Sequence, residues 1–181
     1  MNANLTEIIL VDELDREIGT GEKLLVHQKG LLHRAFSVLI FNKDNQLLIH
    51  QRTRHKYHSG GLWTNTCCGH PNAGESIEKA AFRRLGEEMG FRTELTFLDK
   101  FQYRTDFQNG LVEHEIDHVF IGYFDGTFEV NPEEVADYQW VDMDVLMENV
   151  SKNPDNYTFW FKKILNLESF QAFVSNWVVL A

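Results

Sequence analysis

The segment Trp63–Gly90 constrains the fold more than any other part of the chain, because it joins a polar loop to one amphipathic helix. Helical spacing begins near Ser76 and places apolar residues on one face, namely Ile77, Ala80, Ala81, Leu85 and Met89. Glu75 suits the positive N-terminal end of such a helix, and Gly90 suits its C-terminal stop. The pattern therefore predicts a helix with one buried face that begins near Ser76 and ends at Gly90.

The loop that precedes this helix carries reactive side chains. Cys67 and Cys68 are the two cysteines of the chain, and His70 follows them closely. A thiol, an imidazole and the carboxylates of Glu87 and Glu88 in one loop-and-helix unit favour a metal-assisted site over a purely structural one. Adjacent cysteines are a poor basis for a structural disulfide, so we expect a reducing compartment and a cytoplasmic protein.

Length and charge limit the classes of function. A chain of 181 residues with 43% hydrophobic residues predicts one domain over residues 1–181 with a substantial core. A net charge of -10 argues against a nucleic-acid partner or a membrane surface. The run Phe36–Phe41 is too short to span a bilayer, and the first residues lack the pattern of a secretory signal. We therefore expect a small-molecule partner, with the protein a monomer or a weak homodimer.

The remaining pattern predicts a mixed sheet with helices packed on it. Strands are expected over Glu7–Val11, Arg34–Phe41, Gln46–His50, Thr93–Thr105, Leu111–Phe124 and Tyr138–Val141. Asp12–Gly21 is expected to form a turn or hairpin, Lys23–His33 a short connection, and Gln51–Gly61 a polar, basic loop. Further helices are expected over Asp144–Val150 and Thr158–Val174, with a break at Ser151–Asn156.

One ordered set of residues is similar to a known family motif. Gly69, Glu75, Arg83, Arg84, Leu85, Glu87, Glu88, Gly90 and Phe91 follow the spacing of the Nudix box, G-x5-E-x7-R-E-U-x-E-E-x-G-U, in which U is a bulky apolar residue. Arg84 stands where a Nudix hydrolase has a glutamate that helps to hold magnesium. An arginine there would repel such ions and attract a phosphate.

The segments around the box resemble one branch of this superfamily, type I isopentenyl-diphosphate isomerase. The likeness runs through WTNTCCGHP, EKLLVH, LLHRAFSVLIFN, YRTDFQNGLVEHEIDHVF and YQW, and so covers most of the chain. It implies an α+β fold with a Nudix-like mixed sheet between helices, an α/β/α arrangement. It also implies movement of a double bond, from isopentenyl diphosphate to dimethylallyl diphosphate, in isoprenoid biosynthesis.

Two other functions remain open. One is a Nudix hydrolase that cleaves a nucleoside diphosphate linked to a further group. The other is a catalytically silent domain that binds a metal or a phosphate as a sensor. Arg84 within the box, the Cys-Gly-His segment and the Glu113-x-Glu115 strand favour the isomerase over both.

The resemblance implies a divalent metal site. Its ligands would be His27, His33, His70, Glu113 and Glu115. Glu113 and Glu115 lie two apart on an expected strand, so that both carboxylates point to one face. Imidazoles and carboxylates together suit a first-row ion such as Mn²⁺ or Zn²⁺. The eight histidines of the chain could also lie in loops and in the core without binding a metal. Only the combination of three histidines with two glutamates favours a metal site.

The same resemblance assigns the proton carriers. Cys68, rather than Cys67, aligns with the functional thiol, and Glu115 aligns with the second acid or base. Tyr103 would relay or stabilise a proton near Glu115. Trp160 would stabilise a tertiary carbocation, for which an aromatic face contributes about 2 kcal/mol or more in a dry site. We expect Glu115 to donate and Cys68 to accept in the forward direction, with these roles exchanged in reverse.

Diphosphate recognition falls, by the same resemblance, to four basic residues. These are Lys23, Arg52, Lys56 and Arg84. Arg84 and Glu88 lie four apart on the expected helix and so share a face. Glu88 would hold a Mg²⁺ ion that bridges to the diphosphate, while Arg84 would contact the diphosphate directly. A surface Arg–Glu pair of little energetic value is the ordinary alternative for these two residues.

Overall fold

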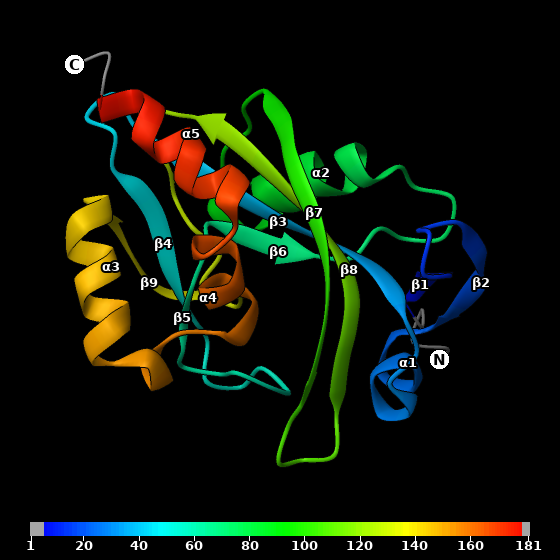
Figure 1. Ribbon diagram of the computed structural model, residues 1–181. Helices are drawn as coiled ribbons and strands as arrows, with labels where there is room; N and C mark the ends of the chain where they lie inside the picture. The colour runs from blue at the N-terminus through cyan, green and yellow to red at the C-terminus, as the bar shows by residue number, and fades with distance from the viewer. Residues whose placement is uncertain (1–5, 179–181) are drawn as a thin grey trace.

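The computed structural model describes residues 6–178 and shows a mixed sheet with helices on both sides (Figure 1). Its strands are β1 Glu7–Val11, β2 Glu17–Glu22, β3 His33–Phe41, β4 Leu47–Arg52, β5 Trp63–Thr64, β6 Cys67–Gly69, β7 Leu95–Asp106, β8 Val112–Tyr123 and β9 Val135–Val141. Its helices are α1 Lys23–Lys29, α2 Ile77–Met89, α3 Met143–Lys152, the 3₁₀ turn η1 Pro154–Asn156, α4 Phe159–Leu165 and α5 Glu168–Val178. This architecture confirms the predicted α+β class.

Strand β3 is the centre of the sheet. It runs parallel to β8 along its whole length, from the pair His33–Glu115 to the pair Phe41–Tyr123. It pairs with β4 only at Phe41–Leu47, where the two strands join. Beyond that point β4 turns away to pair with β5 and β9, and the short strand β6 pairs with β3 instead. The sheet therefore divides between β3 and β4.

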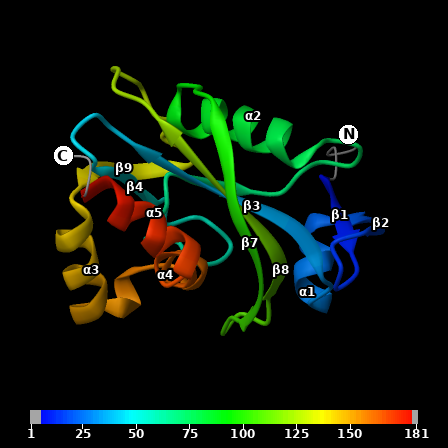
Figure 2. The same cartoon turned by 45° about the horizontal axis from the view of Figure 1, so that its top comes forward.

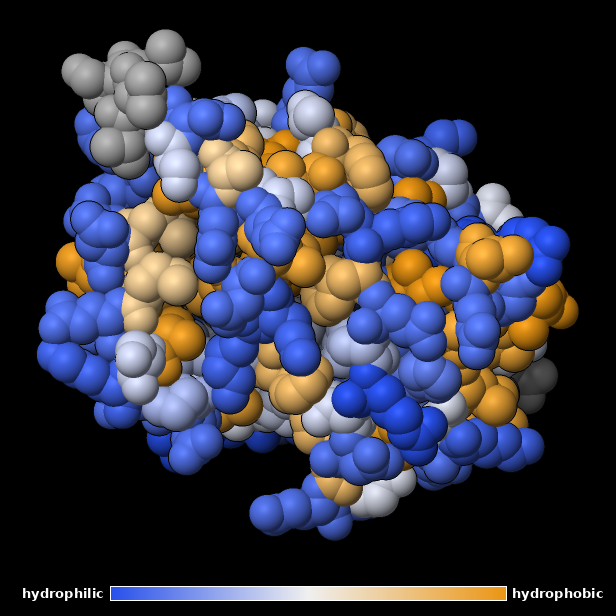
Figure 3. Space-filling view, viewed as in Figure 1, coloured by the Kyte–Doolittle hydropathy of each residue, from blue (hydrophilic) through white to orange (hydrophobic). Residues whose placement is uncertain are grey.

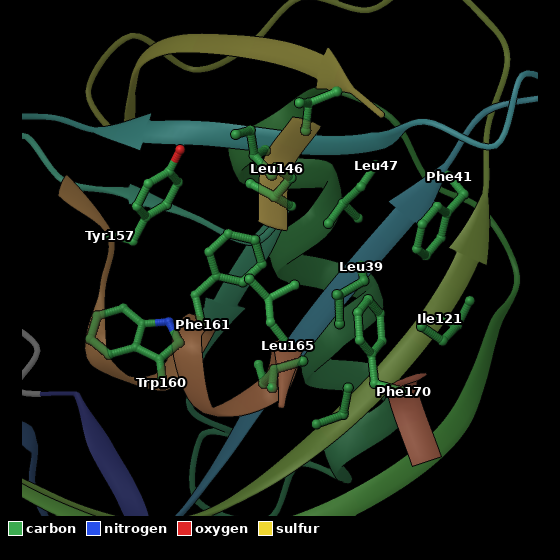
Figure 4. Packing of buried hydrophobic residues seen from close by; sticks show 14 of the residues in the cluster. Leu39, Phe41, Leu47, Ile121, Leu146, Tyr157, Trp160, Phe161, Leu165 and Phe170 are labelled. Carbon is green, nitrogen blue, oxygen red and sulfur yellow. The ribbon is translucent and has the colours of Figure 1, made fainter. Parts of the chain in front are cut away.

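Alternation along β3 separates two apolar cores. Leu39 and Phe41 face the helices α4 and α5, where they pack with Phe161 and Phe170 in the cluster of Figure 4. Val38 and Ile40 face the other way, onto the buried side of α2. Figure 2 shows α2 on one side of the sheet and α4 and α5 on the other. The predicted α/β/α layering is thus present.

The principal helix has the predicted bounds and a clear physical origin. The hydroxyl of Ser76 caps its N-terminus by accepting from the amide of Lys79. Ala80, Leu85 and Met89 are fully buried against the sheet. Gly90 ends it with a left-handed φ of 76°, a conformation that favours glycine.

Two predicted segments were wrong. Lys23–His33 was expected to be a connection, but its first part is the helix α1, capped by the carboxylate of Glu22, which accepts from the amides of Leu24 and Leu25. Thr158–Val174 was expected to be one helix, but it divides after Leu165, because the backbone at Asn166 leaves the helical conformation. The chain then begins a second helix, α5, at Glu168.

Hydrogen bonds between charged groups hold the N-terminal hairpin against the sheet. Asp15, in the turn between β1 and β2, has a positive φ of 61°. Its carboxylate accepts from Arg34 (2.8 Å), Lys100 (2.9 Å) and His118 (2.9 Å) on three different strands. The hairpin leads directly into α1, so these contacts of Asp15 also help to position α1.

The face of the molecule seen in Figure 3 is mostly hydrophilic, with apolar side chains scattered among charged ones. Within residues 6–178, no helix combines the length and the apolar character needed to cross a bilayer. The expectation of a single domain over residues 1–181 stays a prediction.

Candidate active site

A cavity of about 370 Å³ opens where the sheet divides. Every predicted site residue except His27 and His33 lines it. The cavity wall includes residues of β1, β3, β4, β6, β7 and β8, of α2 and α4, Lys23 at the start of α1, the loop after β4 and the loop between β8 and β9. Since polar and aromatic side chains from all these elements converge here, this cavity is the candidate active site.

The five predicted metal ligands are brought together at one end of the cavity. His27, His33, His70, Glu113 and Glu115 each offer one ligand atom, and these atoms all lie within 4.8 Å of one another. His33 Nε2 lies 3.2 Å from His70 Nε2 and 3.3 Å from Glu115 Oε1. The pairing of His33 with Glu115 across β3 and β8 explains their proximity.

The ring orientation fits metal binding. His27 Nδ1 lies 2.6 Å from the carbonyl of Lys23, and His33 Nδ1 lies 2.8 Å from the carbonyl of Leu31. A proton on each Nδ1 leaves Nε2 with a free lone pair that points into the cluster. Within the described chain, His27 Nε2 and Glu113 Oε2 are buried and lack a hydrogen-bond partner. Such orphaned buried atoms fit a divalent ion as their missing partner.

His58 belongs to this cluster but was not predicted. Its Nε2 lies 2.7 Å from Glu113 Oε1, and its ring stacks on Phe107 at a centroid distance of 4.7 Å. His58 therefore orients the carboxylate of Glu113, which is one of the predicted metal ligands. Burial lowers the pKa of His58, and the neighbouring Glu113 only partly offsets this effect. The one signal in the sequence was its place in the polar loop that also carries Arg52 and Lys56.

The two predicted proton carriers flank β3 from opposite edges. Cys68 on β6 pairs with Ser37, whereas Glu115 on β8 pairs with His33. Residues 33 and 37 share a face of β3, so both carriers face the cavity. Tyr103, directly opposite Glu115 across β7 and β8, donates its hydroxyl to Glu115 Oε2 at 2.7 Å.

The environment of Cys68 favours the protonated form of its thiol. Burial raises its pKa to about 12, although Arg52 opposes that shift. Arg52 Nη1 lies 3.8 Å from the sulfur and would stabilise a thiolate. Cys67 instead points to the opposite face, where it is fully buried in the core beneath α2. Only Cys68 of the two cysteines lines the cavity.

Trp160 forms an aromatic wall. Its indole Nε1 donates to Asn65 Oδ1 at 3.2 Å, which fixes the ring. The guanidinium of Arg52 lies over this ring, 5.3 Å from its centroid. The ring thus faces a cation, the kind of charge for which its face is suited.

The four predicted diphosphate-binding residues line the cavity as well. Arg84 on α2 forms an ion pair with Glu88, which is 4% exposed. Burial raises the pKa of Glu88, whereas Arg84 opposes that shift. Lys56 pairs with Glu134, an acidic residue that sequence reasoning did not single out. A second missed carboxyl group, Asp117, accepts from Ser37 Oγ at 2.8 Å on the same wall.

Known structures share this fold. A protein from Deinococcus radiodurans matches with a TM-score of 0.66 and 21% identity, covering 81% of this chain and 89% of that one. The MutT protein from Methanosarcina mazei Go1 matches with a TM-score of 0.63 and 18% identity, covering 80% and 94%. The NUDIX domain model matches residues 31–161. Fold and site together define a protein of the Nudix superfamily.

Curated relatives specify the branch. "Isopentenyl-diphosphate Delta-isomerase 2" of Photorhabdus laumondii subsp. laumondii is 51% identical over 164 residues, which cover 91% of this chain and 93% of the relative. "Isopentenyl-diphosphate Delta-isomerase" of Burkholderia multivorans is 51% identical over 154 residues, covering 85% and 88%. The chain belongs to the type I isopentenyl-diphosphate Delta-isomerase family of the Nudix superfamily.

Proposed function

We propose that this protein converts isopentenyl diphosphate into dimethylallyl diphosphate in the cavity described above. The family membership supports this activity over the Nudix hydrolase alternative. The observation that carries the chemistry is that Cys68 and Glu115, on opposite edges of β3, both line one cavity. A double-bond shift requires a proton to be added at one carbon and another removed two carbons away. Two carriers separated across the substrate meet that need.

Glu115 is the proposed proton donor to the terminal methylene carbon. Its Oε2 accepts the hydroxyl of Tyr103, so that the carboxylate left after proton transfer keeps a hydrogen-bond donor. Cys68, as a thiolate stabilised by the guanidinium of Arg52 at 3.8 Å from its sulfur, is the proposed acceptor of the proton from the carbon next to the diphosphate-bearing one. In the reverse direction the thiol of Cys68 donates the proton, in keeping with the pKa that burial raises. The tertiary carbocation between these steps lies against Trp160.

The His–Glu cluster is the proposed site for Mn²⁺ or Zn²⁺. Its ligands are His27, His33, His70, Glu113 and Glu115. A divalent ion bound there would supply positive charge beside the carboxyl group of Glu115 and would hold that group in place. The protein's own contribution is to keep each imidazole Nε2 free, through the backbone carbonyls that hold Nδ1 of His27 and His33.

The diphosphate is proposed to contact the four cationic side chains on the cavity wall, Lys23, Arg52, Lys56 and Arg84. Arg84, which replaces the hydrolase glutamate, suits binding of the diphosphate rather than activation of water. Glu88, a buried carboxylate beside Arg84, is the proposed protein ligand of a Mg²⁺ ion that accompanies the diphosphate. We further propose a cytoplasmic monomer or weak homodimer without nucleic-acid or membrane partners.

The activity is tested by incubating the protein with isopentenyl diphosphate, Mg²⁺ and Mn²⁺ while recording proton NMR spectra. The isomerase predicts the methyl signals of dimethylallyl diphosphate and no release of phosphate. Release of inorganic phosphate, without the allylic product, would support the hydrolase. Binding without any turnover would support the silent sensor.

A further inference from the structure

Glu134 holds two of the proposed diphosphate-binding cations together. It lies in the loop between β8 and β9 and lines the cavity, with 21% of its side chain exposed. Its Oε2 forms an ion pair with Lys56 Nζ, and its Oε1 lies 3.2 Å from Arg84 Nη2. One carboxylate therefore bridges the loop after β4 and the helix α2.

The cations of the cavity need such a partner, because they face one another. Burial lowers the pKa of Lys23, and Arg84, Lys56 and Arg52 lower it further, although Glu113 opposes them. Mutual repulsion of this kind raises the free energy of the site unless anions lie between the cations.

Glu134 supplies that negative charge in its ionised form. Burial alone would raise its pKa, but the ion pairs with Lys56 and Arg84 outweigh burial and lower it. Glu88 also pairs with Arg84, but it has a proposed role as the Mg²⁺ ligand. Glu134 has no role in binding or chemistry in the proposed function. Its position, on the same groups that a diphosphate would contact, makes it a competitor of the substrate.

We infer that Glu134 is a counter-ion of the diphosphate subsite, which pairs with Lys56 and Arg84 and which the diphosphate must displace from them. The inference rests on the proposed function of Lys56 and Arg84. It makes Glu134 a residue that determines specificity: the carboxylate penalises every anion that cannot replace both of its ion pairs. A bridging diphosphate replaces both, whereas a single small anion does not.

Charge balance sets the direction of the effect. Four cationic side chains and the carboxylates of Glu88 and Glu134 leave the subsite with two net positive charges. Free diphosphate carries about three negative charges, and its Mg²⁺ complex about one. Removal of the Glu134 carboxylate raises the net charge of the subsite from two to three, which favours the free anion more than the less charged Mg²⁺ complex.

The test measures binding of inorganic diphosphate by isothermal titration calorimetry, with and without Mg²⁺. For Glu134→Gln we expect the Kd for diphosphate without Mg²⁺ to fall about tenfold. We also expect Mg²⁺ to increase the affinity for diphosphate by a smaller factor than in the unmodified protein. Glu133→Gln is the matched control, since Glu133 is its neighbour and its side chain is 84% exposed. We expect Glu133→Gln to bind like the unmodified protein.

Outcomes separate this inference from the proposed function. If the unmodified protein binds diphosphate and Lys56→Gln weakens binding, but Glu134→Gln binds no more tightly, the counter-ion role is wrong and the subsite stands. If the unmodified protein binds no diphosphate with or without Mg²⁺, the proposed subsite itself is wrong. The double variant Lys56→Gln/Glu134→Gln should bind diphosphate less tightly than Glu134→Gln alone, since the two residues act through one ion pair.

Discussion

Replacing Tyr103 by Phe tests the coupling between the tyrosine hydroxyl and the proposed acid. Tyr103 and Glu115 are 6% and 5% exposed, and the hydroxyl donates to Glu115 Oε2 at 2.7 Å. A hydrogen bond to a charged group contributes about 1.5–3 kcal/mol. The bond strengthens as Glu115 gives up its proton and becomes anionic, so most of this energy belongs to the transition state.

At about 1.4 kcal/mol for each factor of ten, the loss corresponds to a fall in kcat of roughly 10- to 150-fold. The affinity for inorganic diphosphate should stay within about twofold, because Tyr103 is not among the proposed diphosphate-binding groups. The assay follows dimethylallyl diphosphate by NMR and diphosphate binding by calorimetry on the same preparations.

Tyr157→Phe is the control for this substitution. Tyr157 is a buried tyrosine of the same apolar cluster (Figure 4), but it does not line the cavity. It should keep its activity. Unchanged kcat in Tyr103→Phe, with metal content and fold intact, would refute the coupling of Tyr103 to the acid.

Four further outcomes are expected. Cys68→Ala should abolish turnover and keep diphosphate binding, whereas Cys67→Ala should lower thermal stability and keep turnover; the reverse pattern would identify Cys67 as the reactive thiol. Arg84→Glu should weaken diphosphate binding at least about tenfold by calorimetry, since it places a negative charge beside the anion. Chelation of the divalent metal should stop the reaction, and Mn²⁺ or Zn²⁺ should restore it, as metal analysis and activity would show. Asp15→Asn should destabilise the fold by about 1–3 kcal/mol in urea unfolding. Burial opposes the lowered pKa of Asp15, but Lys100 and Arg34 outweigh it, so the stability it contributes is present above its ordinary pKa and lost as pH falls through the lowered one; an equal acid sensitivity of Asp15→Asn would contradict this.

The sequence predicted the long periodic elements best. The continuous apolar run of β3 and the one-sided pattern of α2 each indicate their structure locally, and both lie where expected. Helix α1 was missed because its Leu24 and Leu25 are exposed, so that it lacks a regular buried face. Strands β5 and β6 are too short for any period to show.

The candidate site divides in the same way. The predicted metal ligands converge as the family likeness implied, whereas His58 and Glu134 were missed. Both act across long separations in the sequence: His58 contacts Glu113, and Glu134 contacts Lys56 and Arg84. Ion pairs between segments far apart in the sequence leave no periodic signal, because the tertiary fold determines their partners.

The choice between the two cysteines follows from the geometry of the central strand. Neighbouring residues of a strand face opposite sides of a sheet, so β6 can offer only one of its cysteines to the cavity. The pairing of Ser37 with Cys68 fixes which one, since Ser37 shares the cavity face of β3 with His33 and hence with Glu115. A slip of β6 by one residue would bury Cys68 under α2 and turn Cys67 toward the cavity. The register of β6 on β3 therefore selects the thiol.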